Sequence, residues 1–390
     1  MPEDGRAESR AGQTRRAPSG DMIARRIAEN GPIPFTEFME AALYSPAGGY
    51  YTSGRQTWGA QGDYITSVDV SPAFARTLAR QAIECWEMLG SPTSFELVEA
   101  GAGRGWLATG MLEYIRAASP GLYDALAVRL VELGGPPAGE AAEKVSWHRS
   151  LDELKPAHAA FVISNELIDS FPVHRVKFTG GELKELFVDF DGSSFFEKEG
   201  PLSNAALAGY FQRAGVAPFE GMTAEVNLEA GRWVRKASAL FSRGFAVTID
   251  YGAPARELYS PERMGGSLHC HFRHTLSDNP FANIGEQDIT AHVDFTTLSL
   301  EGMDAGLSVT GFTTQKNFLL GLGILDELKT PASFGAGGVE DVNFNRALGA
   351  LISPGGMGDS FKVLVAHKGV VKPRLKGFSF KDMTRSLGLP

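Results

Sequence analysis

The stretch SFELVEAGAGRG, residues 94–105, decides the fold of this chain. Its apolar first half predicts a short buried strand, which Glu99 closes. Three glycines follow at alternate positions: Gly101, Gly103 and Gly105. A turn of this kind carries no side chains that block the close approach of a ligand. Because residues 106–117 have helical apolar spacing, the turn should lie at a helix N-terminus, in the first unit of a doubly wound α/β sheet.

Two classes of cofactor bind to such a unit, and the glycine spacing separates them. The dinucleotide fingerprint GxGxxG needs a small residue where this chain has Trp106, because a tryptophan would obstruct close packing of the helix on the strand. The pattern acid-x-Gly-x-Gly-x-Gly resembles instead the first motif of class I S-adenosylmethionine-dependent methyltransferases. S-adenosylmethionine has no pyrophosphate, and it needs room for a carboxypropyl arm and an acceptor for its ammonium. A glycine turn that binds no ligand is the alternative on this stretch alone.

The composition bounds the class of protein. At 390 residues, 43% of them hydrophobic, the chain can bury a large core in two or three structural units. A net charge of −9, without a long Lys/Arg run, argues against nucleic acid as a partner. We also expect no membrane span, because no apolar run approaches ~18 residues. The two cysteines are too few for a disulfide framework and favour a reducing compartment, the cytoplasm or, in a eukaryote, the mitochondrial matrix. The oligomeric state is left open.

We expect an α/β fold: the Rossmann-like sheet of a class I methyltransferase, an N-terminal helical segment and an inserted small antiparallel β/helical subdomain. The insertion is expected because the fourth and fifth predicted strands are separated by more chain than a crossover helix requires, with alternating apolar residues and GG and DG turns. The expected parts are a disordered tail (1–20), the helical segment with a substrate and cofactor loop (21–90), the core (91–172 and 228–390, with a lid loop at 252–300) and the insertion (173–227).

The carboxyl ends of the next strands carry further candidates for cofactor binding. The second predicted strand, residues 126–132, ends in Glu132, where this fold places a carboxylate for ribose hydroxyls. Ser150 and Leu151 follow a weak third strand, where the adenine lies in this class of fold. We expect these three residues to bind the cofactor together with Glu99 and the glycine turn.

The segment NELIDSFP, residues 165–172, follows the fourth predicted strand, at the edge where open α/β sheets bind ligands. Asn165 should reach the cofactor there, and Glu166 and Asp169 should project into the same cleft. Two carboxylates three residues apart can hold a cation between them. Ordinary helix capping by Asn165 and Asp169 is the alternative, and the position after strand four favours a functional role.

Residues 266–295 hold four of the eight histidines: His269, His271, His274 and His292. With neighbouring acids and a cysteine they suggest a metal site, but the spacing H-x-H-x-x-H matches no site with a firm spacing rule. Methyl transfer from a sulfonium needs no metal, so we predict none. The favoured interpretation is a polar lid that contacts the substrate, with His274 as a candidate proton acceptor. A structured surface loop is the alternative.

Six segments together resemble the MidA-like family of class I S-adenosylmethionine-dependent methyltransferases. They occur in the order GPIPFTEFMEAALYSPAGGYY, GDYITSVDVSPAFAR, VEAGAGRGWL, SNELIDSFPVHR, IDYG and GEQDITAHVDF. The resemblance covers about residues 21–368, and GEQDITAHVDF and the GDY loop are its most specific parts. The chain departs from the family pattern at Val68-Asp69, at Ala102 inside the glycine turn, and at Leu133-Gly134-Gly135.

The resemblance implies methyl transfer to an arginine guanidinium on a partner protein, since the family is similar to a mitochondrial complex I assembly factor with that activity. It implies a core subunit of the respiratory NADH:quinone oxidoreductase as the partner during assembly, and cofactor contacts from Gly62 and Asp63. Carboxylates must pair with the guanidinium, and Asp69 and Asp288 join Glu166 and Asp169 as candidates. Two alternatives remain: a non-catalytic S-adenosylmethionine-binding assembly chaperone, and a methyltransferase with a small-molecule acceptor.

Overall fold

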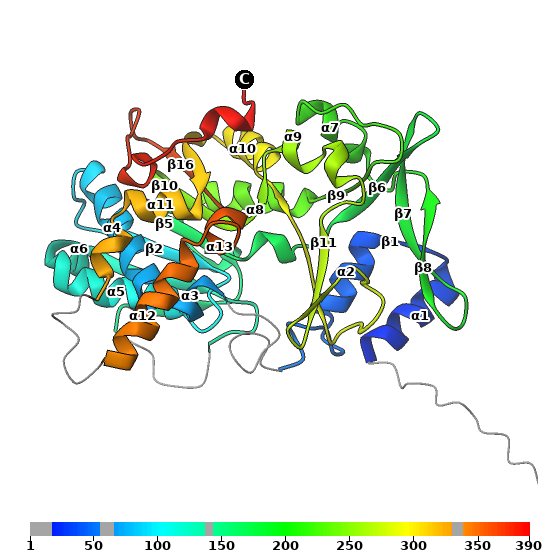
Figure 1. Cartoon of the computed structure of the whole chain (residues 1–390), viewed down its shortest axis with the longest axis horizontal. Helices are drawn as coiled ribbons and strands as arrows, with labels where there is room; N and C mark the ends of the chain where they lie inside the picture. Colours follow the sequence, from blue (N-terminus) through cyan, green and yellow to red (C-terminus); the bar gives the residue numbers. More distant parts are fainter. Residues whose placement is uncertain (1–17, 55–65, 137–142, 330–337) are drawn as a thin grey trace, which may run out of the picture.

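The computed structural model describes residues 18–54, 66–136, 143–329 and 338–390. Figure 1 shows the central sheet and its helices on one side of the molecule and the N-terminal helices with two smaller sheets on the other. The first helix, α1, spans Pro18–Asn30 and so includes the last three residues of the expected tail. These residues are ordered because they pack against a segment far away in the sequence. Ser19 is buried, and its hydroxyl donates to the carbonyl of Ile284 at 3.4 Å.

Eight strands form the central sheet of the described chain: β2 (Phe95–Ala100), β3 (Leu126–Val131), β4 (Val145–His148), β5 (Ala157–Asn165), β10 (Phe241–Ala253), β14 (Val293–Asp294), β15 (Ser308–Thr314) and β16 (Phe361–Lys368). Their order is β15-β16-β10-β5-β2-β3-β4, with β14 beside β10. The strands from β4 to β10 pair in parallel, whereas β16 is antiparallel to both β10 and β15. Strand order reverses between β2 and β5, which opens a crevice at their carboxyl ends. The predicted α/β class with a Rossmann-like sheet is confirmed.

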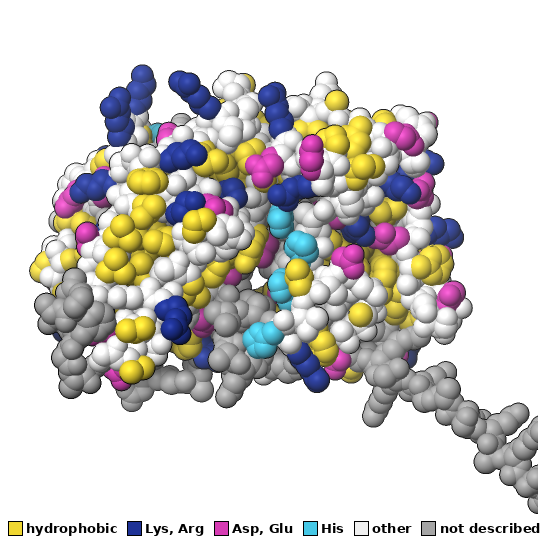
Figure 2. Space-filling view, viewed as in Figure 1, with side chains coloured by type: hydrophobic (Ala, Val, Ile, Leu, Met, Phe, Trp, Pro, Cys, Tyr) yellow, Lys and Arg dark blue, Asp and Glu magenta, His cyan; other side chains and the backbone are white. Residues whose placement is uncertain are grey.

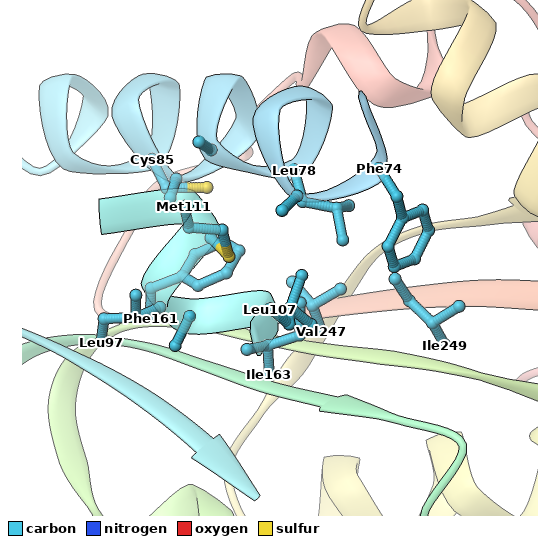
Figure 3. Close-up of a cluster of buried hydrophobic side chains, with 14 of the residues drawn as sticks. Phe74, Leu78, Cys85, Leu97, Leu107, Met111, Phe161, Ile163, Val247 and Ile249 are labelled. Carbon is cyan, nitrogen blue, oxygen red and sulfur yellow. The ribbon is translucent and has the colours of Figure 1, made fainter. Parts of the chain in front are cut away.

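Helices cover both faces of this sheet, because side chains alternate between its faces along every strand. On one face, Figure 3 shows strand residues such as Phe161, Ile163 and Val247 packed against Phe74 and Leu107 of the covering helices. The helices on this side are α4 (Pro72–Met88), α5 (Trp106–Ala118), α6 (Pro120–Ala125), α11 (Gln315–Gly321) and α12 (Gly338–Leu351).

The opposite face of the sheet is covered by α8 (Leu228–Ala239) and α10 (Phe295–Asp304). Here Val162 and Ala246 of the strands, the neighbours in sequence of those on the first face, pack with Trp233 and Leu298. Two apolar layers therefore hold the strands rigid, and the carboxyl ends of β2, β3 and β5 form a fixed platform. Short helices α3 (Ser67–Val70) and α13 (Met357–Ser360) complete this half.

A second, antiparallel sheet contains most of the expected insertion. Its strands run in the order β1-β7-β6-β9, with β8 paired to β7: β1 (Ile33–Pro34), β6 (His174–Thr179), β7 (Glu182–Phe190), β8 (Phe195–Gly200) and β9 (Thr223–Val226). The pairing of β1 with β7 ties the N-terminal segment to this sheet, beside α2 (Phe35–Tyr44) and α7 (Tyr210–Arg213). The predicted division of the chain into a tail, a helical segment, a core and an insertion remains a prediction.

The region 252–300, expected to be a lid loop, is mostly ordered structure instead. It contains α9 (Ala255–Leu258) and a three-stranded antiparallel sheet of β11 (Leu268–Phe272), β12 (Thr275–Ser277) and β13 (Asp288–Ala291), before β14 and α10. Leu268 and Cys270 are buried while His269 and His271 are half-buried, so a strand alternation is present. The polar histidines obscured it in the sequence. Throughout the described residues, each helix is too short or too polar to cross a bilayer.

Candidate active site

A cavity of about 690 Å³ lies at the carboxyl ends of β2, β3 and β5. Residues that follow each of these strands line it, and so do residues of the N-terminal segment and of α8. Its volume falls within the range of sites for small organic ligands. From the predicted set, the lining includes Glu99, Gly101, Gly103, Glu132, Ser150, Leu151, Asn165, Glu166 and Asp69.

The three glycines of the turn have different surroundings. All three have positive φ, of 71° at Gly101, 52° at Gly103 and 74° at Gly105. Gly101 and Gly103 line the cavity, but Gly105 does not. A Cβ at Gly105 would lie 2.7 Å from Cδ1 of Leu130, so this glycine allows close packing of α5 on β3.

Trp106 does not obstruct the packing of the helix, contrary to the sequence argument. It is 48% exposed, the guanidinium of Arg104 lies 4.9 Å from its ring centre, and both side chains line the cavity. The close helix–strand contact falls one residue earlier, at Gly105. The motif still differs from the dinucleotide fingerprint, because the fingerprint has a small residue at the position of Trp106, whichever way this side chain points.

Two acids hold the turn from either side. Glu99 is buried, and its Oε2 accepts a hydrogen bond from the backbone N–H of Ala108 at 2.9 Å. Burial raises the pKa of Glu99 to about 8, and the Ala108 hydrogen bond opposes that rise. Glu132 accepts from the N–H of Gly103 at 2.9 Å. The turn is therefore fixed by side chains that also line the cavity.

Asn165 presents an unsatisfied acceptor at this cavity. Its Nδ2 donates to Glu166 Oε1 at 3.0 Å, but its buried Oδ1 finds no hydrogen-bond partner among the described residues. A buried polar atom without a partner is costly, and such atoms often await a ligand. With Glu99 in the same lining, these oxygen acceptors fit the ammonium of S-adenosylmethionine, which donates. The small side chains of the turn leave space for its carboxypropyl arm.

The lining beyond β3 and β4 suits the other end of the same molecule. Glu132 directly follows β3, and Ser150 and Leu151 follow β4, where Ser150 Oγ accepts from the N–H of Asp152 at 3.2 Å. The carboxylate of Glu132 can accept hydrogen bonds from ribose hydroxyls, and the apolar side chain of Leu151 can pack against an adenine ring. The residues present in the cavity thus fit S-adenosylmethionine as a whole.

Glu166 stands on the cavity wall directly after β5. Its backbone is left-handed, with φ of 53°, which is rare for a residue with a side chain and indicates a constrained position. Its Oε1 accepts from the N–H of Ser67 at 2.9 Å as well as from Asn165. Burial raises the pKa of Glu166 to about 7, and the charges of Asp250 and Asp69 act in the same direction.

Two more buried acids lie behind Glu166. Asp250 Oδ2 accepts from the N–H groups of Leu167, Ile168 and Asp169, at 3.2, 2.8 and 3.4 Å. Burial raises the pKa of Asp250 to about 7 despite these bonds. The pKa of Asp169 is also raised, by burial and then by Asp250 and Asp288. Asp169 does not line the cavity, contrary to the expectation that it projects beside Glu166.

Asp288 is buried on β13 and meets the cavity through a tyrosine. Its Oδ1 accepts from the hydroxyl of Tyr51 at 2.8 Å. Tyr51 and Tyr44 line the cavity, and Tyr44 donates to the carbonyl of Ser170 at 3.0 Å. The sequence interpretation did not single out either tyrosine or Asp250, although GGYY and IDYG stood in the segments that resemble the family.

The structure does not bring His274 to the cavity. It lies on the exposed turn between β11 and β12, with φ of 62°. Figure 2 shows the histidines of this face gathered in a column beside β11. Burial, followed by the charge of Arg263, lowers the pKa of His292 to about 4. Gly62 and Asp63 lie outside the described residues. Among the residues that are described, no three His, Cys, Asp or Glu side chains are grouped so that they could hold a metal ion.

Comparisons with known proteins agree with this geometry. Protein arginine methyltransferase NDUFAF7, mitochondrial, from Homo sapiens is 29% identical over 338 residues, which are 78% of this chain and 73% of the human protein. The Drosophila melanogaster homologue is 28% identical over 70% of this chain and 67% of its own length. A Burkholderia thailandensis protein crystallised with S-adenosyl-homocysteine is 32% identical, with a TM-score of 0.83 over 95% of this chain and 96% of that one.

A family model covers the part of the chain that builds the cavity. Residues 77–313, more than half of the chain, match a family described as "Putative S-adenosyl-L-methionine-dependent methyltransferase". The match spans the glycine turn, Glu132, Asn165, Glu166 and the insertion. From the cavity, the sheet and these likenesses together, the chain belongs to the MidA-like family of class I S-adenosylmethionine-dependent methyltransferases.

Proposed function

We propose that this methyltransferase transfers a methyl group to an arginine guanidinium of a partner protein. The observation that carries the proposal is Glu166 on the cavity wall, backed by the buried carboxyl groups of Asp169 and Asp250. The human and fly relatives, whose names state protein arginine methylation, support it.

The electrostatics of the acids favour a cationic acceptor. Burial raises the pKa of Glu166 and of Asp250 to about 7, and the charge of Asp250 adds to the rise at Glu166. A cation beside Glu166 would relieve the repulsion and restore the ionised form. An arginine side chain is protonated at every physiological pH, and its planar fork pairs well with carboxylates.

We propose that the cofactor lies along the ends of β2, β3 and β4. Asn165 Oδ1 and Glu99 would face its ammonium, Gly101 and Gly103 its carboxypropyl arm, and Glu132 its ribose hydroxyls. Ser150 and Leu151 would bound the adenine. The predicted contacts of Gly62 and Asp63 remain part of this proposal. The acceptor would then approach from the side of β5, where Glu166 lies.

The chain's part in the transfer is to orient the acceptor and hold its proton. When bound, S-adenosylmethionine would supply an electrophilic methyl group, which would pass to the acceptor nitrogen as the carbon–sulfur bond breaks and its electron pair stays on sulfur. Glu166 pairs with the guanidinium and receives the proton that the nitrogen loses as the new bond forms. Most of the rate should come from alignment of nitrogen, carbon and sulfur.

The partner and the compartment are proposals that rest on the resemblance. A core subunit of the respiratory NADH:quinone oxidoreductase is the first acceptor to examine, during assembly of that complex. The compartment would be the cytoplasm of a bacterium or the mitochondrial matrix of a eukaryote.

The test is single-turnover transfer of a labelled methyl group into an extract of source cells that lack this enzyme. We expect the label on an arginine of one protein, located by mass spectrometry of its peptides. Label on lysine or on a small metabolite contradicts the proposal, and a metabolite would support the small-molecule alternative. Saturable binding of S-adenosylmethionine without any transfer would support the non-catalytic chaperone.

A further inference from the structure

Two tyrosines from the N-terminal segment line the cavity on the side of β5. Tyr44 ends α2, and the chain then folds back along that helix, with the N–H of Tyr51 bonded to the carbonyl of Leu43 at 2.9 Å. This return brings the two rings together, with centres 5.4 Å apart and planes inclined by 26°. The pair is thus a preformed aromatic surface in the cavity lining.

Each hydroxyl of the pair is fixed by a different part of the fold. Tyr51 donates to Asp288 on β13, 237 residues away, at 2.8 Å. Tyr44 donates to the carbonyl of Ser170, 126 residues away, at 3.0 Å. The hydroxyls of Tyr44 and Ser170 also lie 3.0 Å apart, and Ser170 Oγ lies 2.8 Å from the carbonyl of Leu167, to which it can donate. A phenol oxygen has two lone pairs, so Tyr44 keeps at least one that can accept an N–H, whichever hydroxyl donates in that pair.

The phenol of Tyr44 is a neutral hydrogen-bonding group. Burial is the first cause of a raised pKa at Tyr44, and Asp288 and Asp169 raise it further. Tyr44 belongs to the same electrostatic neighbourhood as the acids behind Glu166, because Asp169 and Asp288 act on it and Ser170 lies four residues after Glu166. An acceptor side chain beside Glu166 would meet an aromatic surface and several negative charges.

We propose that Tyr44 and Tyr51 form the acceptor wall of the cavity and select a planar guanidinium over the ammonium of lysine, with Asp288 and Ser170 as positioning residues. The proposal rests on the proposed arginine methylation. A guanidinium stacks on aromatic faces and is weakly hydrated, whereas an ammonium is a compact, strongly hydrated charge. The Tyr44 oxygen would accept one N–H of the fork while Glu166 pairs with another.

A purely structural role for the two tyrosines is the competing explanation. They join the N-terminal segment to β13 and to the turn after β5, so their loss could loosen the fold. Such a role would lower the unfolding temperature and the affinity for S-adenosylmethionine together. The acceptor wall instead predicts a change in acceptor KM and in arginine preference while the affinity for S-adenosylmethionine stays at the parent value, even where loss of the hydrogen bond to Asp288 lowers the unfolding temperature.

The experiment uses the full chain and two synthetic peptides. One peptide covers the arginine located in the extract experiment, and the other has lysine at that position. The variants are Tyr44→Phe, Tyr51→Phe and Tyr51→Leu, with Tyr123→Phe as the control, since Tyr123 lies on α6 away from the cavity lining. Each is measured for acceptor KM, kcat, cofactor affinity and unfolding temperature.

We expect Tyr44→Phe to raise the acceptor KM about tenfold, as for loss of one hydrogen bond to a charged group. Tyr51→Leu should raise it at least as much and narrow the ratio of arginine to lysine methylation. Tyr51→Phe, which keeps the ring, should fall between this variant and the parent. Tyr123→Phe should match the parent in all four quantities.

The outcomes separate this inference from the function on which it rests. If the parent methylates arginine and the variants keep its acceptor KM and arginine preference, the acceptor wall is wrong while the function stands. If Tyr51→Leu fails to fold, the two phenylalanine variants decide, because they keep the ring volume. A parent that methylates no arginine overturns the function and the inference together.

Discussion

At the scale of single residues, substitution at two glycines of one turn should differ in its effect on ligand binding, although both have positive φ and both substitutions should lower stability. Gly103 lines the cavity, so Gly103→Val should abolish S-adenosylmethionine binding, because a β-branched side chain would occupy space that the ligand needs. Gly105 packs on Leu130, so Gly105→Ala should lower the free energy of unfolding by about 1–3 kcal/mol. Titration calorimetry and urea unfolding separate the two effects. Equal loss of ligand affinity in both variants, with equal stability, would contradict this division.

Glu166 should control the rate of transfer and its pH dependence. Because the pKa of Glu166 is about 7 in the free protein and the ionised form pairs with the acceptor, kcat/KM should rise with pH through about 7. Glu166→Gln should remove that rise and lower methyl transfer by tens-fold, as for loss of a charge-assisted hydrogen bond worth ~1.5–3 kcal/mol. Cofactor affinity should stay near the parent value.

The matched control for Glu166 is Asp278→Asn, which changes an exposed carboxyl outside the cavity lining. It should transfer methyl at the parent rate with the parent pH profile. Parent-rate transfer by Glu166→Gln itself would show that this carboxylate does not hold the acceptor, even if the cofactor assignment survives.

His274→Ala should also transfer methyl at the parent rate. This residue was a candidate proton acceptor from its place among the histidines, but it occupies an exposed hairpin turn outside the cavity lining. Single-turnover transfer checks the expectation. A tens-fold loss of rate in a variant that binds the cofactor normally would return His274 to the catalytic groups.

The sequence predicted the cavity-lining residues that lie at the carboxyl ends of strands. Gly101, Gly103, Glu132, Ser150 and Asn165 line the cavity, because parallel strands all bring their carboxyl ends to one edge, whereas Gly105 does not. That these residues contact the cofactor stays a prediction. Tyr51 could not be predicted in this way, since its place depends on Asp288, 237 residues away. The presence of four histidines in residues 266–295 did not predict which of their side chains would face the cavity.

At the scale of elements, the turn after β5 is held by a single carboxylate of β10. Asp250 accepts three backbone N–H groups, from Leu167 to Asp169, and so sets the position of the segment that begins with Glu166. Asp250→Ala would leave these donors unpaired in a buried place. We expect it to lower the free energy of unfolding by about 2–4 kcal/mol and to lower methyl transfer as well.

Urea unfolding of Asp250→Ala beside Asp278→Ala provides the comparison for this element. Asp278 is exposed, so its removal should change the free energy of unfolding very little. If both variants unfold at the parent urea concentration, the carboxylate does not hold the turn. The signal for Asp250 was present in the sequence, because IDYG ends a buried strand, but its partners became evident only from the neighbouring strand.

Strands and helices with strong periodicity were predictable, and the weakly patterned ones were not. The apolar first half of residues 94–105 agrees with β2, and the helical spacing of residues 106–117 agrees with α5. The β11–β13 sheet was missed because histidines take positions where apolar residues would mark a strand. The sequence pattern identifies a strand or helix only when its buried positions are occupied by apolar residues and its exposed positions by polar ones.

At the scale of the whole molecule, buried acids should make the cofactor-free protein less stable as the pH rises. The pKa is about 8 for Glu99 and about 7 for Glu166 and Asp250, against about 4 in an unfolded chain. From pH 5 to 7 the unfolded chain has released these protons while the folded chain still holds them. The unfolded state therefore binds fewer protons, and the free energy of unfolding falls as pH rises.

Each of these groups can contribute up to about 1.4 kcal/mol per pH unit in that window. Acids whose pKa is lowered, such as Glu185 beside His174, act in the opposite direction but only at lower pH, where stability is lost on acidification. Urea unfolding of the cofactor-free protein should therefore show its highest stability near pH 5 and a decline toward pH 8. Glu99→Gln should make the free energy of unfolding depend less steeply on pH, because one fewer carboxyl group then holds a proton in the folded protein. Stability that rises from pH 5 to 8 would mean that these carboxyl groups are ionised in the folded protein, and the argument for a cation-binding cavity would lose its electrostatic basis.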